Sequence, residues 1–301
     1  LFRLGNMQSA LQGATGSIGA CIATTCTYPI EIVRTRIQAG KTDGKSGIFA
    51  IFLHILKTEG MKGLFSGLSS QYIQTSLANF LFFYFYSLFR RLAKKMWIKF
   101  NQPNKVCIES NEESELEKVH LPSSVNLLVG IAAAIAQVLL ITPINVSLTR
   151  IKTNSPPASP NNRNLLTILL QILKSEGFSK LYAGIGPALI LTVNPGIEFT
   201  IIESLADFYK DKTNQKRLGG LATFIISAIG KIGATLVTYP YILSKVRMQN
   251  SGETNLFVLV SKMISESGIL GLYAGIQIQL IKSVMFACVR NLVKEKINSL
   301  M

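Results

Sequence analysis

The stretch YPIEIVRTR at residues 28–36 decides the fold, because its pattern occurs three times in the chain. The pattern is an aromatic residue or threonine, then a proline, then an arginine seven positions after the proline. It returns as TPINVSLTR at residues 142–150 and as YPYILSKVR at residues 239–247. A fixed pattern in three copies indicates a chain built from internal repeats. The prolines and arginines are Pro29 and Arg36, Pro143 and Arg150, and Pro240 and Arg247.

A second block, marked by two glycines, follows each of these stretches. The two glycines of a block are seven residues apart in every copy, and an aromatic residue precedes the second glycine by two positions. Agreement in two separate blocks is hard to obtain by chance, so the repeat covers most of the chain. The glycine pairs are Gly60 and Gly67, Gly177 and Gly184, and Gly268 and Gly275.

Each repeat holds two apolar segments that approach or exceed the ~20 residues a bilayer-spanning helix needs. A short amphipathic stretch separates the two segments, as at residues 48–57, which is typical of a helix lying on a membrane surface. Prolines inside apolar runs predict kinked helices at Pro29, Pro143 and Pro240. We predict one domain over residues 1–301, with repeats at 8–98, 122–212 and 216–301 and an acidic loop at 99–121. The apolar segments lie near 9–38, 68–98, 123–152, 184–210, 217–249 and 275–298.

Composition agrees with a membrane protein and excludes several other classes. Of 301 residues, 48% are hydrophobic and 16% are charged, against roughly 25% charged in a typical soluble domain. The net charge of +15 indicates an anionic lipid surface or an anionic substrate when the protein lies in a membrane. Basic residues are spread over helix ends and loops, which argues against nucleic acid as a partner. Four cysteines without a CxxC pair, and two histidines, predict no metal site, no disulfide scaffold and no cofactor.

The repeat resembles that of the mitochondrial carrier family, which reads Pro-x-acid-x-x-base-x-base, then acid-Gly, then aromatic-base-Gly. The first copy matches best, and the resemblance extends over nearly the whole chain. It implies the mitochondrial carrier fold: an all-α integral membrane protein of six transmembrane helices in three pseudo-symmetric two-helix repeats, with short surface helices. It also implies a central cavity and transport by alternating access.

The chain departs from the family at the gate. In the family, the acid and base after each proline form interhelical salt bridges that close the matrix side. Here one carboxylate and two cations remain, so a three-pair network cannot form and Glu31 pairs with at most one cation at full strength. Gln38 and Gln249 match the glutamine braces of the family, and Lys152 replaces the third. The acid positions hold Glu31, Asn145 and Ile242, and the base positions hold Arg34, Leu148 and Lys245.

Further motifs resemble the peroxisomal, adenine-nucleotide branch of the family. The base of aromatic-base-Gly, which lies near bound cardiolipin in the family, is replaced by Ser66, Ala183 and Ala274. The resemblance implies exchange of cytosolic ATP for lumenal AMP or ADP across the peroxisomal membrane, in support of fatty-acid activation and β-oxidation. Membrane lipids and a receptor that inserts peroxisomal membrane proteins are the expected partners, and a monomer is the expected state. The motifs are NFLFFYFY at 79–86, AAA at 132–134 with Gln137, LTVNP at 191–195, and Lys231 with LVTYP at 236–240.

Positions that differ among the three copies are candidates for binding an asymmetric substrate. Lys231 lies nine residues before its proline and Lys282 seven after its last glycine. A charge near the bilayer centre costs at least ~2.5–3.5 kcal/mol on insertion scales, so both lysines are read as functional, and as phosphate ligands. The alternative is a lysine that reaches a headgroup or a structural carboxylate. Weaker candidates for the substrate site are Gln74, Asn79, Leu191, Asn194 and Glu198.

Several readings remain open at this point. Carriers of CoA, NAD or FAD share much of the pattern, and the mitochondrial inner membrane is the alternative location. From another class, a non-transporting receptor or scaffold with the carrier fold fits the depleted gate. We do not expect an enzyme, because the sequence holds no nucleophile–histidine–acid set and no phosphate-cradling loop.

Overall fold

The structure is a computed structural model that describes residues 2–42, 47–101, 121–155, 164–213, 220–286 and 289. Over these residues it is helical, with no strand. Most of the acidic loop predicted at 99–121 lies outside the described residues. The α-helices are α1 (Phe2–Gln38), α2 (Ile48–Leu64), α3 (Leu68–Asn101), α5 (Ser123–Thr153), α6 (Leu165–Ser175), α7 (Ile185–Ile190), α8 (Asn194–Thr213), α9 (Gly220–Ser251) and α10 (Leu256–Ser267). The 3-10 helices are η2 (Phe178–Tyr182), η3 (Leu191–Val193) and η4 (Ile269–Tyr273). A final helix follows, described over 276–286.

The predicted order of long and short helices is confirmed. The prolines Pro29, Pro143 and Pro240 lie inside α1, α5 and α9, and each helix continues past its proline. The predicted segment 184–210 lies in one continuous helical stretch, which the 3-10 turn η3 interrupts between α7 and α8. Pro195 explains the break, because its missing N–H removes the backbone hydrogen bond to Leu191 and the chain tightens into a 3-10 turn there.

Membrane-spanning character is measurable for most of the long helices. Within the described residues, four helical stretches are both long and apolar enough to cross a bilayer: Val125–Thr153, Phe178–Thr213, Ile225–Ser251 and Ile269–Phe286. The other two long helices, α1 and α3, have 37 and 34 residues, which is ample length for a span. In α3, Gln71, Gln74 and Asn79 lower the hydropathy of its first half.

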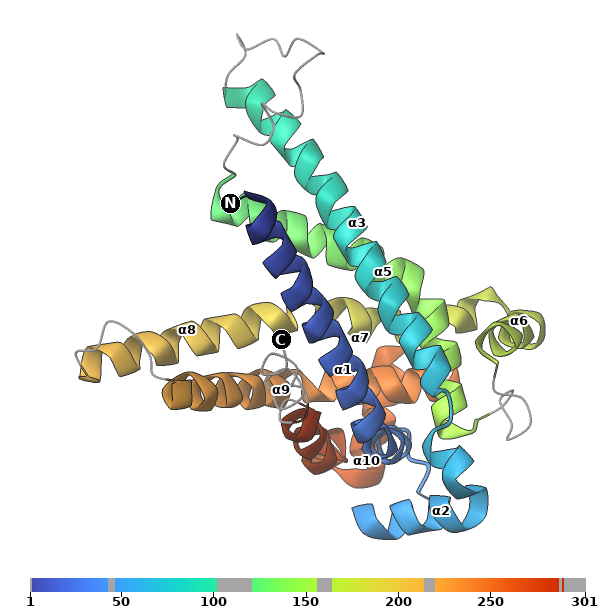
Figure 1. The fold of residues 1–301 in the computed structure, drawn as a ribbon. Helices are drawn as coiled ribbons and strands as arrows, with labels where there is room; N and C mark the ends of the chain where they lie inside the picture. The colour runs from blue at the N-terminus through green and yellow to red at the C-terminus, as the bar shows by residue number, and fades with distance from the viewer. Residues whose placement is uncertain are drawn as a thin grey trace.

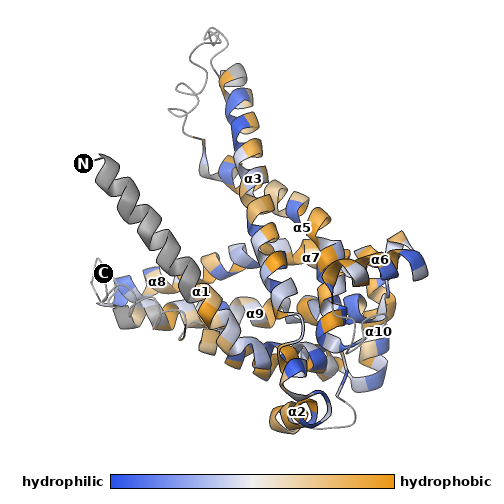
Figure 2. Ribbon diagram, turned by 45° about the vertical axis from the view of Figure 1, so that its right-hand side comes forward, coloured by the Kyte–Doolittle hydropathy of each residue, from blue (hydrophilic) through white to orange (hydrophobic). Residues whose placement is uncertain are grey.

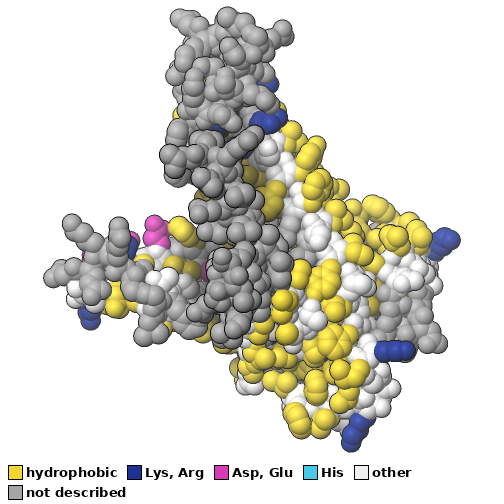
Figure 3. All heavy atoms as spheres, viewed as in Figure 1, with side chains coloured by type: hydrophobic (Ala, Val, Ile, Leu, Met, Phe, Trp, Pro, Cys, Tyr) yellow, Lys and Arg dark blue, Asp and Glu magenta, His cyan; other side chains and the backbone are white. Residues whose placement is uncertain are grey.

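The long helices pack in pairs, α3 along α5 and α8 along α9 (Figure 1). The outer surface of α3 is apolar, as the yellow side chains of Figure 3 show along this helix. Phe80 and Phe83 are exposed, as expected of side chains that face lipid rather than of a stacking site for a base. The last turns of α3 carry a hydrophilic cluster (Figure 2), suited to a headgroup layer. That cluster comprises Arg90, Arg91, Lys94 and Lys95.

The glycine spacing seen in the sequence has a backbone cause. Each surface helix is interrupted or ended by the first glycine of its block, which has positive φ and ψ near 180°, a region essentially restricted to glycine. A short helical turn follows, and the second glycine, again at positive φ, starts the next long helix. The φ and ψ values are 66° and −165° at Gly60, 88° and 170° at Gly177, and 65° and −172° at Gly268.

The second glycine of each block also packs against the following repeat. A Cβ atom at Gly67 would lie 2.8 Å from Ile151 on α5, and one at Gly184 would lie 3.0 Å from the backbone oxygen of Lys245 on α9. A Cβ atom at Gly275 would lie 2.8 Å from Ile37 on α1. Repeat one therefore contacts repeat two, two contacts three, and three returns to one.

We expect Gly184→Ala to destabilise the protein more than Gly40→Ala. Both glycines have nearly the same φ, 79° and 77°, so both variants carry the backbone cost of ~1–2 kcal/mol. Only Gly184 has a neighbour in the way, and contact with a backbone oxygen adds about 1–3 kcal/mol, the usual cost of overpacking. Thermal unfolding in detergent measures the difference, and equal losses in Tm would show that the close approach is not needed.

Candidate functional site

The three proline-containing helices are joined at one end by a closed ring of arginine–carbonyl hydrogen bonds. Arg36 Nε donates to the backbone oxygen of Lys152 at 3.1 Å, and Arg150 Nε donates to that of Gln249 at 3.3 Å. Arg247 Nε donates to the backbone oxygen of Gln38 at 3.2 Å and closes the ring. Each donor lies seven residues after its proline, and each acceptor lies nine residues after the proline of the next repeat. We call these three residues the arginine ring.

Carboxylates hold two members of the arginine ring in place. Glu59 accepts from both terminal nitrogens of Arg36, at 2.5 and 3.0 Å. Glu176 accepts from both terminal nitrogens of Arg150, one of them at 2.8 Å. In the third repeat the equivalent position is Ser267, and Arg247 forms no ion pair within the described residues. The basic residue seven after each proline is therefore structural, since it ties one repeat to the next.

A second charged group surrounds Glu31 on α1. Its Oε1 atom lies 2.5 Å from Arg34 and 2.9 Å from Lys152 of α5, and its Oε2 atom lies 3.1 Å from Lys282 of the final helix. The side chains of Glu31 and its three cations are mostly buried, and that of Lys282 is the most exposed of them at 27%. We call Glu31, Arg34, Lys152 and Lys282 the gate cluster. One carboxylate here faces three cations from three helices.

Neutral side chains complete the surroundings of the gate cluster. Arg34 donates to Gln279 of the final helix, and Lys152 donates to Gln71 of α3 at 2.7 Å. Gln71 in turn donates to Gln74 at 2.9 Å. The predicted site did not include Lys152, Gln71 or Gln279. The sequence did indicate that Lys152 is unusual. Lys152 lies nine residues after its proline, where the other two repeats have the neutral residues Gln38 and Gln249.

The predicted gate residues divide into two groups. The family pattern offers Glu31 two cations, Arg34 and Lys245. Arg34 pairs with Glu31, but both residues lie on the same helix. Lys245 makes no ion pair or hydrogen bond with the described residues. The two glutamines act across helices: Gln38 donates to the Tyr239 hydroxyl at 3.2 Å, and Gln249 accepts from Thr149 at 2.8 Å. Both glutamines are buried, so they brace α1 against α9 and α5 against α9.

The second predicted cavity lysine also has a carboxylate partner. Lys231 on α9 lies 2.7 Å from Glu198 on α8, and their side chains are 49% and 26% exposed. Among the described residues this pair forms no hydrogen bond or ion pair with the gate cluster, so Lys231 and Lys282 belong to separate ion pairs. Glu198, predicted as a weaker candidate for the substrate site, is thus the ion-pair partner of a stronger candidate, Lys231.

The remaining predicted substrate residues are placed as follows. Asn194 donates to Thr238 at 2.9 Å and so joins the start of α8 to α9. Leu191 lies half-buried in η3, beside the break in the helix. Asn79 is exposed and makes no hydrogen bond with the described residues. Only Lys282, directly, and Gln74, through Gln71, are brought to the gate cluster.

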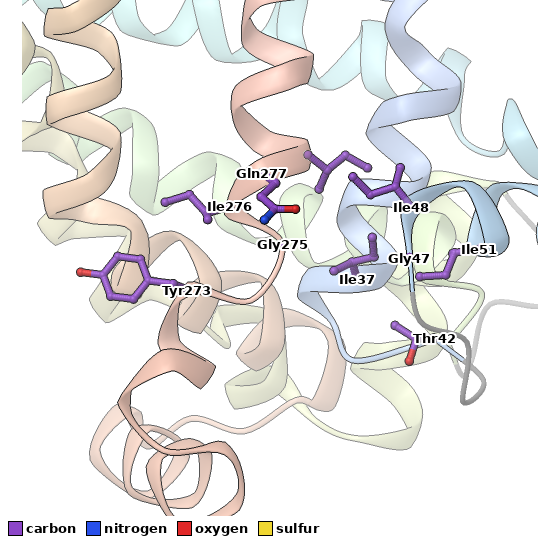
Figure 4. A pocket seen from close by; sticks show the side chains of 10 residues that line it. Ile37, Thr42, Gly47, Ile48, Ile51, Tyr273, Gly275, Ile276 and Gln277 are labelled. Carbon is purple, nitrogen blue, oxygen red and sulfur yellow. The ribbon is translucent and has the colours of Figure 1, made fainter.

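A surface pocket of about 360 Å³ lies elsewhere, between the end of α1, the start of α2 and the turn into the final helix (Figure 4). Ile37 and Ile48 line one side of it, and Tyr273 and Ile276 the other. An adjoining apolar cavity of about 340 Å³ shares Ile48 with it. Among the described residues, the side chains that line the two cavities carry no charge, in contrast to the gate cluster.

The geometry and the sequence together assign the family. The family described as mitochondrial carrier protein matches residues 5–97, 119–213 and 216–301. The chain therefore belongs to the mitochondrial carrier family.

Relatives from this family cover almost the whole chain. Peroxisomal membrane protein PMP34 of Mus musculus is 29% identical over 310 residues, which cover 97% of this chain and 93% of the relative. Peroxisomal adenine nucleotide carrier 1 of Glycine max is 26% identical over 319 residues, covering 98% and 92%. The peroxisomal nicotinamide adenine dinucleotide carrier of Arabidopsis thaliana is 26% identical over 323 residues, covering 95% and 94%.

Acid should weaken the arginine ring through Glu176, which lies outside the membrane spans. Hydrogen bonds from Arg150 hold the pKa of the Glu176 carboxyl below its ordinary value of 4.5. The stabilisation is fully present above pH 4.5 and is lost as the pH falls through the lowered pKa. We expect wild type to unfold at a higher temperature than Glu176→Gln at neutral pH. The difference in Tm between the two proteins should become smaller in acid.

The matched control for this measurement is Asp207→Asn. The Asp207 side chain is 63% exposed and lies 3.1 Å from Lys210 of the same helix, so its loss should change Tm little at any pH. A gap between wild type and Glu176→Gln that stays constant with pH would contradict a role for the ionised carboxylate.

Proposed function

We propose that this protein is a nucleotide transporter of the peroxisomal membrane, and specifically an antiporter of adenine nucleotides. It exchanges cytosolic ATP for lumenal AMP or ADP and thereby supports fatty-acid activation and β-oxidation. The protein is a multi-pass membrane protein and not an enzyme. It acts as a monomer among membrane lipids, and a receptor for peroxisomal membrane proteins inserts it.

One observation carries the proposal: the gate cluster holds three cations against a single carboxylate. Buried charge without a partner is costly, so positive charge in excess inside a membrane bundle favours an anionic substrate. Lysine binds phosphate as a point charge, and a nucleotide supplies phosphate groups. The names of the relatives, which include an adenine nucleotide carrier, support the same substrate class.

The nearest competing function is transport of a larger nucleotide cofactor, CoA, NAD or FAD. The nicotinamide adenine dinucleotide carrier among the relatives, at the same 26% identity, favours keeping NAD as the second candidate. The non-transporting receptor or scaffold is less well supported. A scaffold has no use for lysines at the membrane interior, where they are expensive.

Uptake of labelled ATP into liposomes that hold the purified protein tests the function. The liposomes are preloaded with AMP, ADP, CoA, NAD or nothing. We expect AMP or ADP to drive uptake, and Lys282→Ala to reduce it by about 10–100-fold, since one hydrogen bond to a charged group contributes roughly 1.5–3 kcal/mol.

Lys262→Ala serves as the control, because Lys262 lies on α10 with its side chain 69% exposed. It should transport at the wild-type rate. Uptake driven only by CoA or NAD would show that the second candidate function, transport of a larger nucleotide cofactor, is correct. Absence of uptake with every preload, from protein shown to be folded, would favour the receptor or scaffold.

A further inference from the structure

The third repeat lacks the carboxylate that the other two repeats place on the arginine ring. Glu59 and Glu176 each accept from both terminal nitrogens of their arginine, whereas the equivalent residue of the third repeat is Ser267. Arg247 is held by its Nε, which donates to the backbone oxygen of Gln38 at 3.2 Å. Its two terminal nitrogens make no hydrogen bond or ion pair with the described residues. The third arginine is therefore fixed in place, and the fork of donors that binds a planar or tetrahedral anion is unused.

The backbone at Ser267 matches that at Glu59. Each of the two residues directly precedes the first glycine of its block. That glycine has φ and ψ of 66° and −165° at Gly60, and of 65° and −172° at Gly268. Ser267 is the last residue of α10 and is exposed. A side chain at position 267 therefore starts from the same local geometry as the carboxylate of the first repeat, and it is accessible from solvent.

A glycine four residues further on leaves space beside both positions. A Cβ atom at Gly63 would lie 3.0 Å from Oε2 of Glu59, so glycine there gives the carboxylate room. The third repeat keeps this glycine as Gly271, although the residue before it is only a serine. A Cβ atom at Gly271 would lie 3.5 Å from the Oγ atom of Ser267. The third site thus retains room for a group larger than a hydroxyl.

A phosphate on Ser267 would closely reproduce the missing glutamate. In glutamate, Cβ, Cγ and Cδ connect Cα to the carboxylate oxygens, and in phosphoserine Cβ, Oγ and phosphorus connect Cα to the phosphate oxygens. The number of bonds from Cα to the charged oxygens is therefore the same. Phosphoserine carries a charge of about −1.5 to −2 at pH 7 and forms charge-assisted hydrogen bonds with arginine. Such arginine–phosphate pairs are frequently bidentate.

We propose that Ser267 is a phosphorylation site, and that its phosphate binds the terminal nitrogens of Arg247 in place of the absent carboxylate. A protein kinase transfers the γ-phosphoryl group of a nucleoside triphosphate. The bond from Ser267 Oγ to phosphorus forms, the bond from that phosphorus to the leaving nucleoside diphosphate breaks, and the hydroxyl proton is released. The phosphate joins α10 to α9, as Glu59 joins α2 to α1. This inference is independent of which substrate the protein transports.

Two negative features of the site oppose a phosphate, and both are compensated. Position 267 ends a helix, where the helix dipole disfavours an anion. Glu176 also lies at a helix end, as the C-cap of α6, and still pairs with its arginine. The second feature is the neighbouring carboxylate of Glu266, which lies 3.9 Å from Lys262 and so has a cation of its own. The arginine therefore decides the sign of the effect.

The first experiment measures thermal unfolding of the full chain in detergent, with phosphoserine incorporated during translation at position 267 or at position 265. Ser265 is the matched control, because it is exposed on the same helix and its hydroxyl donates only to the backbone oxygen of Lys262, at 2.9 Å. Phosphate on Ser267 should raise Tm by about 2 °C or more, and phosphate on Ser265 should not. Ser267→Glu should raise Tm in the same direction, and Ser267→Gln, which has the same size without the charge, should not.

Replacement of the arginine tests the contact itself. In Arg247→Gln, phosphate on Ser267 should no longer raise Tm. Where Arg247→Gln does not fold, Arg247→Lys replaces it. The gain in Tm should then be smaller than with arginine, because lysine binds phosphate as a point charge without the bidentate fork. An equal gain in the presence and absence of the arginine fork would overturn the inference.

The second experiment determines whether the serine is modified. The purified protein is incubated with ATP and a eukaryotic cell extract, and its phosphopeptides are mapped by mass spectrometry. Phosphate is expected on Ser267, and it should be absent from that peptide in Ser267→Ala and present in Ser265→Ala. Absence of phosphate from Ser267 in the wild-type protein would overturn the inference.

Free phosphate distinguishes a modification site from a site for a dissociable anion. Inorganic phosphate at millimolar concentration is added to the unmodified protein, and Tm is compared with that in chloride at equal ionic strength. We expect no difference that depends on Arg247. A rise in Tm that Arg247→Gln or Arg247→Lys removes would show that the arginine binds a free anion, and it would overturn the assignment to phosphorylated Ser267.

Discussion

The gate cluster depends on one carboxylate, Glu31, shared by cations from three helices. In a fully symmetric carrier, three acids and three bases would distribute this task evenly. Here Asn145 and Ile242 occupy the other two acid positions, so no second carboxylate is available nearby at those sites. The lysine at position 152 compensates by approaching Glu31 from α5 at 2.9 Å. A site with so little negative charge is well suited to a ligand that supplies it.

The arginine ring and the glycine contacts perform a different task from the gate cluster. They follow the threefold repeat closely, with a donor, an acceptor and a close backbone approach in each copy. The gate cluster and the Lys231–Glu198 ion pair do not follow the threefold repeat. Symmetric positions thus hold the repeats together, while asymmetric positions carry the charge that a nucleotide can recognise.

Much of this architecture could be predicted from the sequence. The number, order and length of the helices follow from apolar segments and from prolines and glycines at fixed spacing. The break before Pro195 could not be placed in advance, because a proline within an apolar segment is compatible with either a kink or an interruption. Lys231 and Lys282 were identified as unusual because they differ from the matching positions of the other repeats and because they lie deep in apolar segments. Their partners Glu198 and Glu31 depend on how helices are rotated about their axes, which a repeat pattern does not specify.

Among the described residues, ion pairing across the three contacts between α1, α5 and α9 is unequal. The α1–α5 contact contains the Glu31–Lys152 ion pair. The α5–α9 and α9–α1 contacts consist of hydrogen bonds, through Gln249 and Gln38. An anionic ligand therefore finds an interhelical carboxylate at one of these three contacts, whereas the other two are crossed by hydrogen bonds from Arg150 and Arg247. A molecule with threefold sequence symmetry is thus asymmetric in charge at the contacts that join its three proline-containing helices.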